Sequence, residues 1–354
     1  VFFDANSDGL LDIIIGNFGY FVSSGNFDSK LALLLNTGTL TDPSFDMVDR
    51  DYADLSSFNI NSVYPTFGDM DADGDKDMII GNEDGQLHYF VNNADTGSPA
   101  EFSLSKPVYM NIDVGETAMP QIVDVNRDGK LDMIVGERSG TIDYFENIGT
   151  PTEALFTSSP TNDFFGAVDV LLECCSGYSA PFLTNDSVGN YVLYVGSEQG
   201  FLYQYNNIDG NLNGSFNIVD SLFLSGLNIT ISGADLNNDG NTELIYGEYA
   251  GGITVLKKGI PSYIGIRETN TDNINVDVFP NPAKSVVYLQ LRGKPYYENV
   301  NVQILNFLGQ VISTHQFTYS GSEMKIDLEG TSPGIYLTRI RTNGFVCTKK
   351  LIIK

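Results

Sequence analysis

Short apolar runs separated by polar turns recur along residues 1–258. Between residues 63 and 104 they predict four strands, at 63–68, 77–81, 86–92 and 101–104. Apolar residues alternate with other residues after the glycine turns, as at Leu87 and Tyr89, which is typical of a half-buried strand. No stretch shows the period of an amphipathic helix. The pattern therefore predicts an all-β protein.

An acidic loop joins the first two predicted strands of each repeat. It reads D-x-[DN]-x-D-G-x-x-[DE] in four copies: loop one (residues 4–12), loop two (69–77), loop three (124–132) and loop five (235–243). A glycine stands twelve positions after each opening Asp, at Gly16, Gly81, Gly136 and Gly247. Counting back twelve from Gly196 gives an eroded loop four (184–192), in which Thr184, Val188 and Val192 replace acidic residues.

The loops open at residues 4, 69, 124, 184 and 235, spacings long enough for four short strands each. Four-stranded units repeated in this way predict the blades of a β-propeller. Five repeats are visible, and the first lacks most of its opening strand. We therefore expect further blades upstream of Val1 and interpret the chain as a fragment or processed product; closure of five blades is the alternative.

The loop spacing predicts calcium sites. Calcium takes six to eight oxygen ligands, and alternate residues of one loop can supply them. We expect side-chain oxygens from the first, third, fifth and ninth positions and a backbone carbonyl from the seventh. The predicted ligands are Asp4, Asn6, Asp8, Leu10 and Asp12; Asp69, Asp71, Asp73, Asp75 and Asp77; Asp124, Asn126, Asp128, Lys130 and Asp132; and Asp235, Asn237, Asp239, Asn241 and Glu243.

The alternative is that these residues only form Asx-turns between strands. Four copies with one ligand spacing favour the metal, and we expect its role to be structural. Loop four has lost three of its acidic positions and is expected to bind no calcium.

Charge divides the chain. Residues 1–275 hold 40 acidic and 10 basic side chains (10 − 40 = −30), and residues 276–354 hold 5 and 9 (9 − 5 = +4). The acidity argues against a nucleic acid partner, because phosphate neutralisation needs Lys and Arg, and it favours cations. No apolar run approaches the roughly 20 residues of a spanning helix, so we expect no membrane-spanning segment.

Catalytic arrangements are scarce. The two histidines, His88 and His315, have no neighbouring sequence that suggests a base beside a nucleophile. Cys174, Cys175 and Cys347 form no disulfide framework, although a vicinal bridge between the first two remains an alternative. The sequence predicts no catalytic residues.

The acidic loops, the strand and glycine that follow them, and phrases such as Tyr144-Phe-Glu-Asn-Ile-Gly-Thr-Pro151 resemble FG-GAP/VCBS repeats over about residues 1–258. The resemblance implies a propeller similar to that of integrin α-subunits, usually of about seven blades, with calcium in many loops.

A polar stretch at 259–275 predicts a linker, and alternating strands in 276–354 predict a small β-sandwich. The phrases Phe279-Pro-Asn-Pro-Ala283, Gly334-Ile-Tyr336 and Lys349-Lys-Leu-Ile-Ile-Lys354 resemble the C-terminal sorting domain of the type IX (Por) secretion system. That implies export, with a secreted or outer cell surface location; an ordinary immunoglobulin-like module is the alternative.

These features predict a calcium-stabilised, non-catalytic module that binds or adheres to extracellular glycans or proteins. The alternative is an accessory propeller of a secreted polysaccharide-degrading lyase or hydrolase whose catalytic region lies upstream or is not recognisable.

Overall fold

The computed structural model describes the chain except for residues 24–25, 96, 173–175, 225, 258–259, 263–274, 293–296, 307–310, 320–322, 329 and 343–344. Cys174 and Cys175 therefore lie outside the described residues, as does the expected linker apart from residues 260–262 and 275. Residue contacts divide the chain into two units, Val1–Ile264 and Gly265–Lys354.

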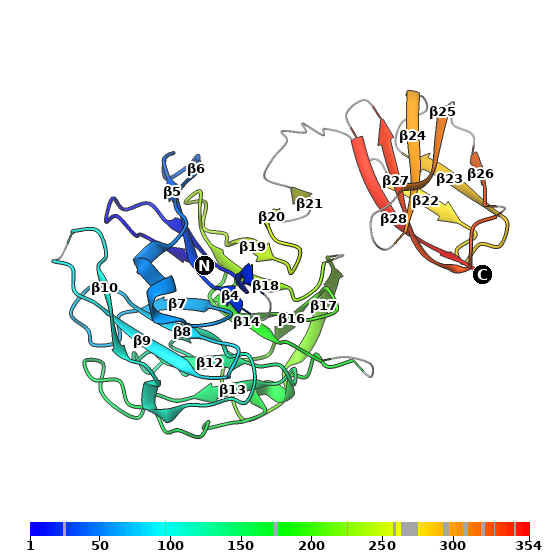
Figure 1. The fold of residues 1–354 in the computed structure, drawn as a ribbon. Helices are drawn as coiled ribbons and strands as arrows, with labels where there is room; N and C mark the ends of the chain where they lie inside the picture. Colours follow the sequence, from blue (N-terminus) through cyan, green and yellow to red (C-terminus); the bar gives the residue numbers. More distant parts are fainter. Residues whose placement is uncertain are drawn as a thin grey trace. The chain divides into compact units, whose positions relative to one another are not determined.

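The first unit consists of antiparallel sheets that follow one another along the chain, from blue to yellow-green in Figure 1. An acidic loop, or the eroded loop four, joins the first two strands of each. Sheet one holds β1 (Phe2–Phe3), β2 (Asp12–Gly16), β5 (Leu31–Asn36) and β6 (Phe45–Asp49); sheet two holds β7 (Tyr64–Gly68), β8 (Asp77–Gly81), β9 (Leu87–Asn92) and β10 (Phe102–Lys106). Sheet three holds β11 (Met119–Val123), β12 (Asp132–Gly136) and β13 (Ile142–Phe145).

Sheet four holds β14 (Ala180–Asn185), β15 (Tyr191–Gly196), β16 (Phe201–Asn206) and β17 (Asn217–Phe223); sheet five holds β18 (Thr230–Ala234), β19 (Glu243–Gly247), β20 (Ile253–Lys257) and β21 (Ile260–Ser262). β3 (Tyr20–Ser23) and β4 (Asn26–Asp28) form a separate hairpin. Single 3₁₀ turns, η1 (Tyr52–Phe58), η2 (Tyr109–Asn111) and η3 (Phe165–Ala167), lie in the connections that lead into sheets two, three and four.

The second strand of each sheet is an inner strand, paired on both sides. All five residues of β8 and of β12 are buried, as their continuous apolar runs predict. The recurring glycine at the end of this strand marks a close approach to the next sheet. A Cβ on Gly81 would lie 2.1 Å from the carbonyl oxygen of Ala118, and one on Gly136 would lie 1.9 Å from that of Ser179. Any side chain there would clash with the neighbouring backbone, so glycine is required.

Apolar clusters fill the spaces between successive sheets. Sheets one and two share the cluster of Ile14 and Phe90, sheets two and three that of Ile79 and Val135, sheets three and four that of Ile134 and Leu193, and sheets four and five that of Leu202 and Tyr246. A further cluster packs Ile13 of sheet one against Ile245 and Val255 of sheet five, and β1 contacts β18. Each sheet of this unit therefore shares a core with two others, and the last sheet in chain order contacts the first.

The second unit has two sheets around one core. β22 (Asn275–Phe279), β23 (Val286–Arg292) and β26 (Met324–Asp327) form the first; β25 (Val311–Tyr319), β24 (Tyr297–Asn306), β27 (Gly334–Thr342) and β28 (Phe345–Ile353) form the second. Buried side chains from both sheets, among them Leu289, Ile326, Val302 and Ile340, pack together. In the described part of the chain, no helix has the length and apolarity needed to cross a bilayer.

Residues 279–283 form hydrogen bonds with the C-terminal strand. The side-chain Nδ2 of Asn281 donates to the carbonyl of Lys350 at 2.8 Å, and its Oδ1 accepts from the N–H of Ile352 at 2.9 Å. The N–H of Ala283 donates to the carbonyl of Ile352 at 2.7 Å. Two of the sequence phrases that resemble a sorting domain therefore meet at one edge of this unit.

Candidate metal centre

Loops one, two, three and five follow one backbone path. The residue at the fourth position has a left-handed φ of 57–61° in each, although it is Ser7, Ala72, Arg127 or Asn238. The glycine at the sixth position also has a positive φ, from 81° to 102°, in each loop. L-residues other than glycine rarely adopt this conformation and lose about 1–2 kcal/mol in it. Four different residues share it here, so the loop as a whole imposes the path.

The opening carboxylate organises each of these loops. It accepts the N–H of the sixth-position glycine at 2.9 Å in loop one, 3.2 Å in loop two, 3.0 Å in loop three and 2.8 Å in loop five. The fifth-position carboxylate in turn accepts the N–H of the seventh residue, which is Leu10, Asp75, Lys130 or Asn241. These bonds fold the acidic residues toward one another.

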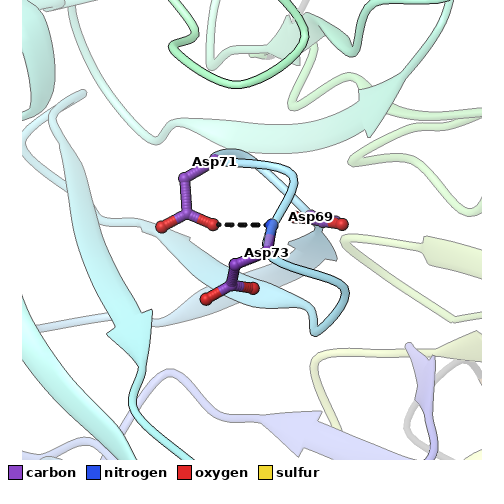
Figure 2. Close-up of side chains that lie close together, drawn as sticks. All are labelled: Asp69, Asp71 and Asp73. Carbon is purple, nitrogen blue, oxygen red and sulfur yellow. Dashed lines mark hydrogen bonds between the residues drawn. The ribbon is translucent and has the colours of Figure 1, made fainter. Parts of the chain in front are cut away.

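Loop two has the densest carboxylate cluster (Figure 2). Asp69, Asp71 and Asp73 each offer an oxygen, and these oxygens lie within 4.8 Å of one another. Two oxygens bound to one calcium at about 2.3–2.6 Å are at most about 5 Å apart, so this spacing fits a shared ion. The N–H of Asp73 donates to Oδ1 of Asp71 at 3.3 Å. Oδ1 of Asp69 and Oδ1 of Asp75 are buried and accept no hydrogen bond.

Buried carboxylate oxygens without donors are unfavourable unless a cation neutralises them. Burial, together with the neighbouring aspartates, raises the pKa values of Asp71 and Asp75. Burial also raises the pKa of Asp77 to about 6, although three hydrogen bonds favour its charged form. The clustered carboxylates of Asp69, Asp71 and Asp73 therefore fit calcium, and the ion would neutralise charge that burial makes unfavourable.

The ninth-position aspartates have a second role that the loop pattern does not reveal. Asp12, Asp77 and Asp132 are at most 1% exposed. Each accepts the N–H of the second loop residue through one oxygen, at 2.9, 3.2 and 3.1 Å. The other oxygen accepts the N–H of an asparagine at the end of, or just after, the third strand, at 2.8, 2.9 and 2.8 Å. These carboxylates therefore tie the loop to the third strand.

The asparagines that they bind are Asn36, Asn92 and Asn147, and sequence reasoning missed them. Each is buried and uses its own Oδ1 to hold the next turn, as Asn147 does with the N–H groups of Gly149 and Leu155 at 2.9 and 3.1 Å. The signal available in the sequence was an asparagine fifteen positions after Asp77 and again after Asp132.

Loops one, three and five carry an asparagine at the third position, so each brings carboxylates together with a neutral amide. Asn126 and Asn237 accept the N–H of the fifth-position Asp at 2.9 Å through Oδ1, the oxygen expected to face an ion. In loop three the ammonium of Lys130 lies 3.0 Å from Oδ2 of Asp128 and donates to the carbonyl of Asn147. Lys130 therefore pairs with a carboxylate of its own loop, whereas Lys76 of loop two forms none of the ion pairs among the described residues.

Loop four is a tight hairpin turn. β14 continues through Thr184 to Asn185, and Oδ1 of Asp186 accepts the N–H groups of Val188 and Asn190, both at 2.9 Å. This is the Asx-turn that the alternative interpretation describes. Unlike the fourth residues of the other loops, Ser187 is not among the residues with positive φ.

Arg127 reaches this turn from loop three. Its guanidinium donates to Oδ1 of Asn185 at 3.1 Å, to the carbonyl of Gly189 at 2.8 Å and to Oδ1 of Asp209 at 2.8 Å. It also lies 3.8 Å from the centre of the Tyr191 ring, a cation–π contact. The guanidinium of Arg127 therefore lies beside the loop in which Thr184, Val188 and Val192 replace acidic residues.

Family models match two parts of the chain, one within the first unit and one within the second. Residues 69–135, which span loops two and three, match the family model of the FG-GAP-like repeat. Residues 277–354 match that of the secretion system C-terminal sorting domain. The chain carries an FG-GAP-like repeat followed by a sorting domain. The sorting domain indicates export through the type IX secretion system and a secreted or cell-surface location.

Solved structures give weaker likenesses. The extracellular domain of the putative hybrid two component system BT4673 from B. thetaiotaomicron is 13% identical, with 92% of this chain and 49% of that one covered and a TM-score of 0.30. A mutant of AofleA from Arthrobotrys oligospora is 8% identical, with 82% and 90% covered and a TM-score of 0.36. This chain thus spans about half the length of the BT4673 domain. No curated protein matches it.

Proposed function

We propose that the first unit is a five-bladed, calcium-stabilised β-propeller that acts as a non-catalytic binding or adhesion module for an extracellular glycan or protein. The observation that carries the proposal is the carboxylate cluster of Asp69, Asp71 and Asp73 in loop two, in which Oδ1 of Asp69 is buried and accepts no hydrogen bond. The common backbone path of loops one, three and five extends the proposal to four calcium ions.

The propeller assignment rests on the contacts among the five sheets. Each sheet shares an apolar cluster with two neighbours, and Ile13 packs with Ile245 and Val255 to join the first sheet to the last. In a propeller, radial repetition of sheets buries their faces in this way. These contacts favour a ring of five sheets over the larger ring that the resemblance to integrin-like repeats implies.

The calcium ligands proposed here are those of loops one, two, three and five. Their carboxylates and amides supply hard oxygens, and the ion would neutralise charge that burial makes unfavourable. Since each loop joins the first two strands of a sheet, an ion would hold those strands in register. Extracellular calcium, at about 1 mM, and modules with dissociation constants of roughly 10⁻⁴ M give RT ln 11, or about 1.4 kcal/mol per site.

The proposed ligand surface is at the opposite end of the second strands from the acidic loops. Phe18 follows β2 and Tyr249 follows β19, two residues after the recurring glycine in both sheets. Their rings meet edge to face with centroids 6.2 Å apart, while the residues remain 48% and 64% exposed. Leu227, whose carbonyl accepts the N–H of Tyr249, is 57% exposed beside them. Exposed aromatic side chains suit stacking on sugar rings or contacts with a protein partner.

Two measurements on the purified full chain test the proposal. Removing calcium with a chelator should lower the stability of the first unit by several kcal/mol in total, if four sites contribute about 1.4 kcal/mol each. Identical melting curves with and without chelator would refute the calcium role.

For the binding role, the chain is screened against a panel of polysaccharides and extracellular proteins. Tyr249→Ala should weaken binding to any ligand found, while leaving the calcium-dependent melting unchanged. Unaltered binding by this variant would refute the proposed surface.

A further inference from the structure

The outer face of the sheet β25-β24-β27-β28 carries a group of basic side chains. Along β27, Thr338 and Ile340 are fully buried, so the alternating residues Arg339 and Arg341 lie on the opposite, outer face. Lys350 of β28 pairs in register with Leu337, which is on that same outer face, and Lys350 is exposed. The register therefore places three cationic side chains on one face of two adjacent strands.

Among the side chains that the structure describes in these four strands, no carboxylate balances the cations. The described side chains of the four strands include Arg339, Arg341, Lys349 and Lys350, and none of them is Asp or Glu. The outer face of the other sheet is different, because Asp277, Lys325 and Asp327 alternate there with the buried Val276 and Ile326. On the opposite sheet the cation Lys325 has carboxylates beside it in the pattern, whereas the described charged side chains of β27 and β28 are all basic.

The arrangement suits a broad acidic surface rather than a small anion. Arg339 and Arg341 are two residues apart on a strand, so their Cα atoms are about 6.5–7 Å apart. A flat face of four strands offers no enclosed site for one ion, but guanidinium groups at this spacing can each bind a separate carboxylate in bidentate geometry. Neighbouring outward residues such as Gln303 and Thr314 add neutral hydrogen-bonding groups.

We propose that this basic face docks on a carboxylate-rich protein surface of the type IX export machinery. The sorting domain implies interaction with this machinery, and on this face the described charged side chains of β27 and β28 are all basic. Complementary charge accelerates encounter and fixes the orientation of docking. The inference concerns the second unit and does not depend on calcium or on the ligand of the first.

The first test compares two charge reversals of equal size in the full chain, expressed in a Gram-negative host with a type IX system. Arg341→Glu changes the basic face, and Lys325→Glu changes the opposite sheet; both residues are exposed. Arg341→Glu should reduce the exported fraction about fivefold, and Lys325→Glu by less than about twofold. The double variant Arg339→Lys with Arg341→Lys keeps the charge and should retain export.

Unchanged export of Arg341→Glu would overturn the proposal, as would an equal loss with Lys325→Glu. Melting of the purified variants checks that they fold. If Arg341→Glu does not fold, Arg341→Gln replaces it, with the same reduction expected.

A second measurement identifies the partner. A photocrosslinking amino acid in place of Gln303 lies on the basic face, and one in place of Gln290 on the opposite sheet is the matched control. An adduct from the first position that contains a component of the type IX machinery supports the proposal. An adduct with lipopolysaccharide alone, or machinery adducts only from the control position, would overturn it.

Discussion

Replacing Asp132 with alanine is expected to destabilise the first unit even when no calcium is present. The carboxylate is fully buried and accepts the N–H of Val125 at 3.1 Å, the N–H of Asn147 at 2.8 Å and the hydroxyl of Tyr144 at 3.2 Å. The variant leaves three buried donors without an acceptor. Each unsatisfied group costs about 1–3 kcal/mol, and some will reach water in the space left behind, so we expect a loss of about 2–5 kcal/mol.

Asp128→Ala is the matched control within the same loop. Asp128 is at the fifth position, its side chain is 35% exposed, and its ion pair with Lys130 lies at the surface. Such pairs contribute at most about 1 kcal/mol. In chelator, Asp128→Ala should therefore be close to the parent in stability, and its deficit should appear only when calcium is added.

The assay is denaturant unfolding of each variant with chelator and with about 1 mM calcium. Amide hydrogen exchange at residues 125 and 147 reports the local loss, because a two-unit chain need not unfold in one step. If Asp132→Ala is as stable as the parent in chelator, the buried carboxylate does not hold the loop, and the argument from its hydrogen bonds is wrong.

Three further outcomes follow from the structure. Arg127→Ala should accelerate hydrogen exchange in the turn between Asn185 and Gly189, with or without calcium. Unchanged protection of these amides would show that the guanidinium contacts do not stabilise the turn. Asp143 is 7% exposed, and its burial, with Glu137 and Asp163 nearby, raises its pKa to about 7. Because the folded state disfavours the charged form, stability should fall as pH rises from about 4 through 7. Asp143→Asn should be more stable than the parent at pH 8 by on the order of 1–4 kcal/mol, and equal to it near pH 4. Urea unfolding at the two pH values would measure both differences. Deleting 277–354 should leave the chain inside the cell, and export of the truncated chain would contradict the role of the sorting domain.

Much of the strand pattern could be predicted from the sequence because it depends on local periodicity. The strands expected at 63–68, 77–81, 86–92 and 101–104 differ from β7–β10 by no more than two residues at either end. The repeated glycine was visible too, but its reason was not. The carbonyl of Ala118 that excludes a side chain at Gly81 belongs to the next sheet, so no local rule could reveal the contact.

The candidate site was predictable in its residue types and not in its connections. The spacing of Asp69, Asp71 and Asp73 indicates shared coordination because alternate residues of one loop are close in any compact turn. The bonds of Asp132 to Asn147 and of Arg127 to loop four join residues 15 and about 60 positions apart. They depend on how strands and sheets pack, which the sequence pattern does not encode locally.

Counting bound calcium tests the central claim most directly. The full chain is freed of calcium and titrated with it by isothermal titration, and a second sample dialysed against about 1 mM calcium is measured by metal analysis, beside Asp73→Ala in loop two and Asp186→Ala in loop four. The account predicts four calcium ions per chain, three for Asp73→Ala and four for Asp186→Ala. A chain that binds no calcium, or a count that Asp186→Ala lowers and Asp73→Ala leaves unchanged, would contradict it.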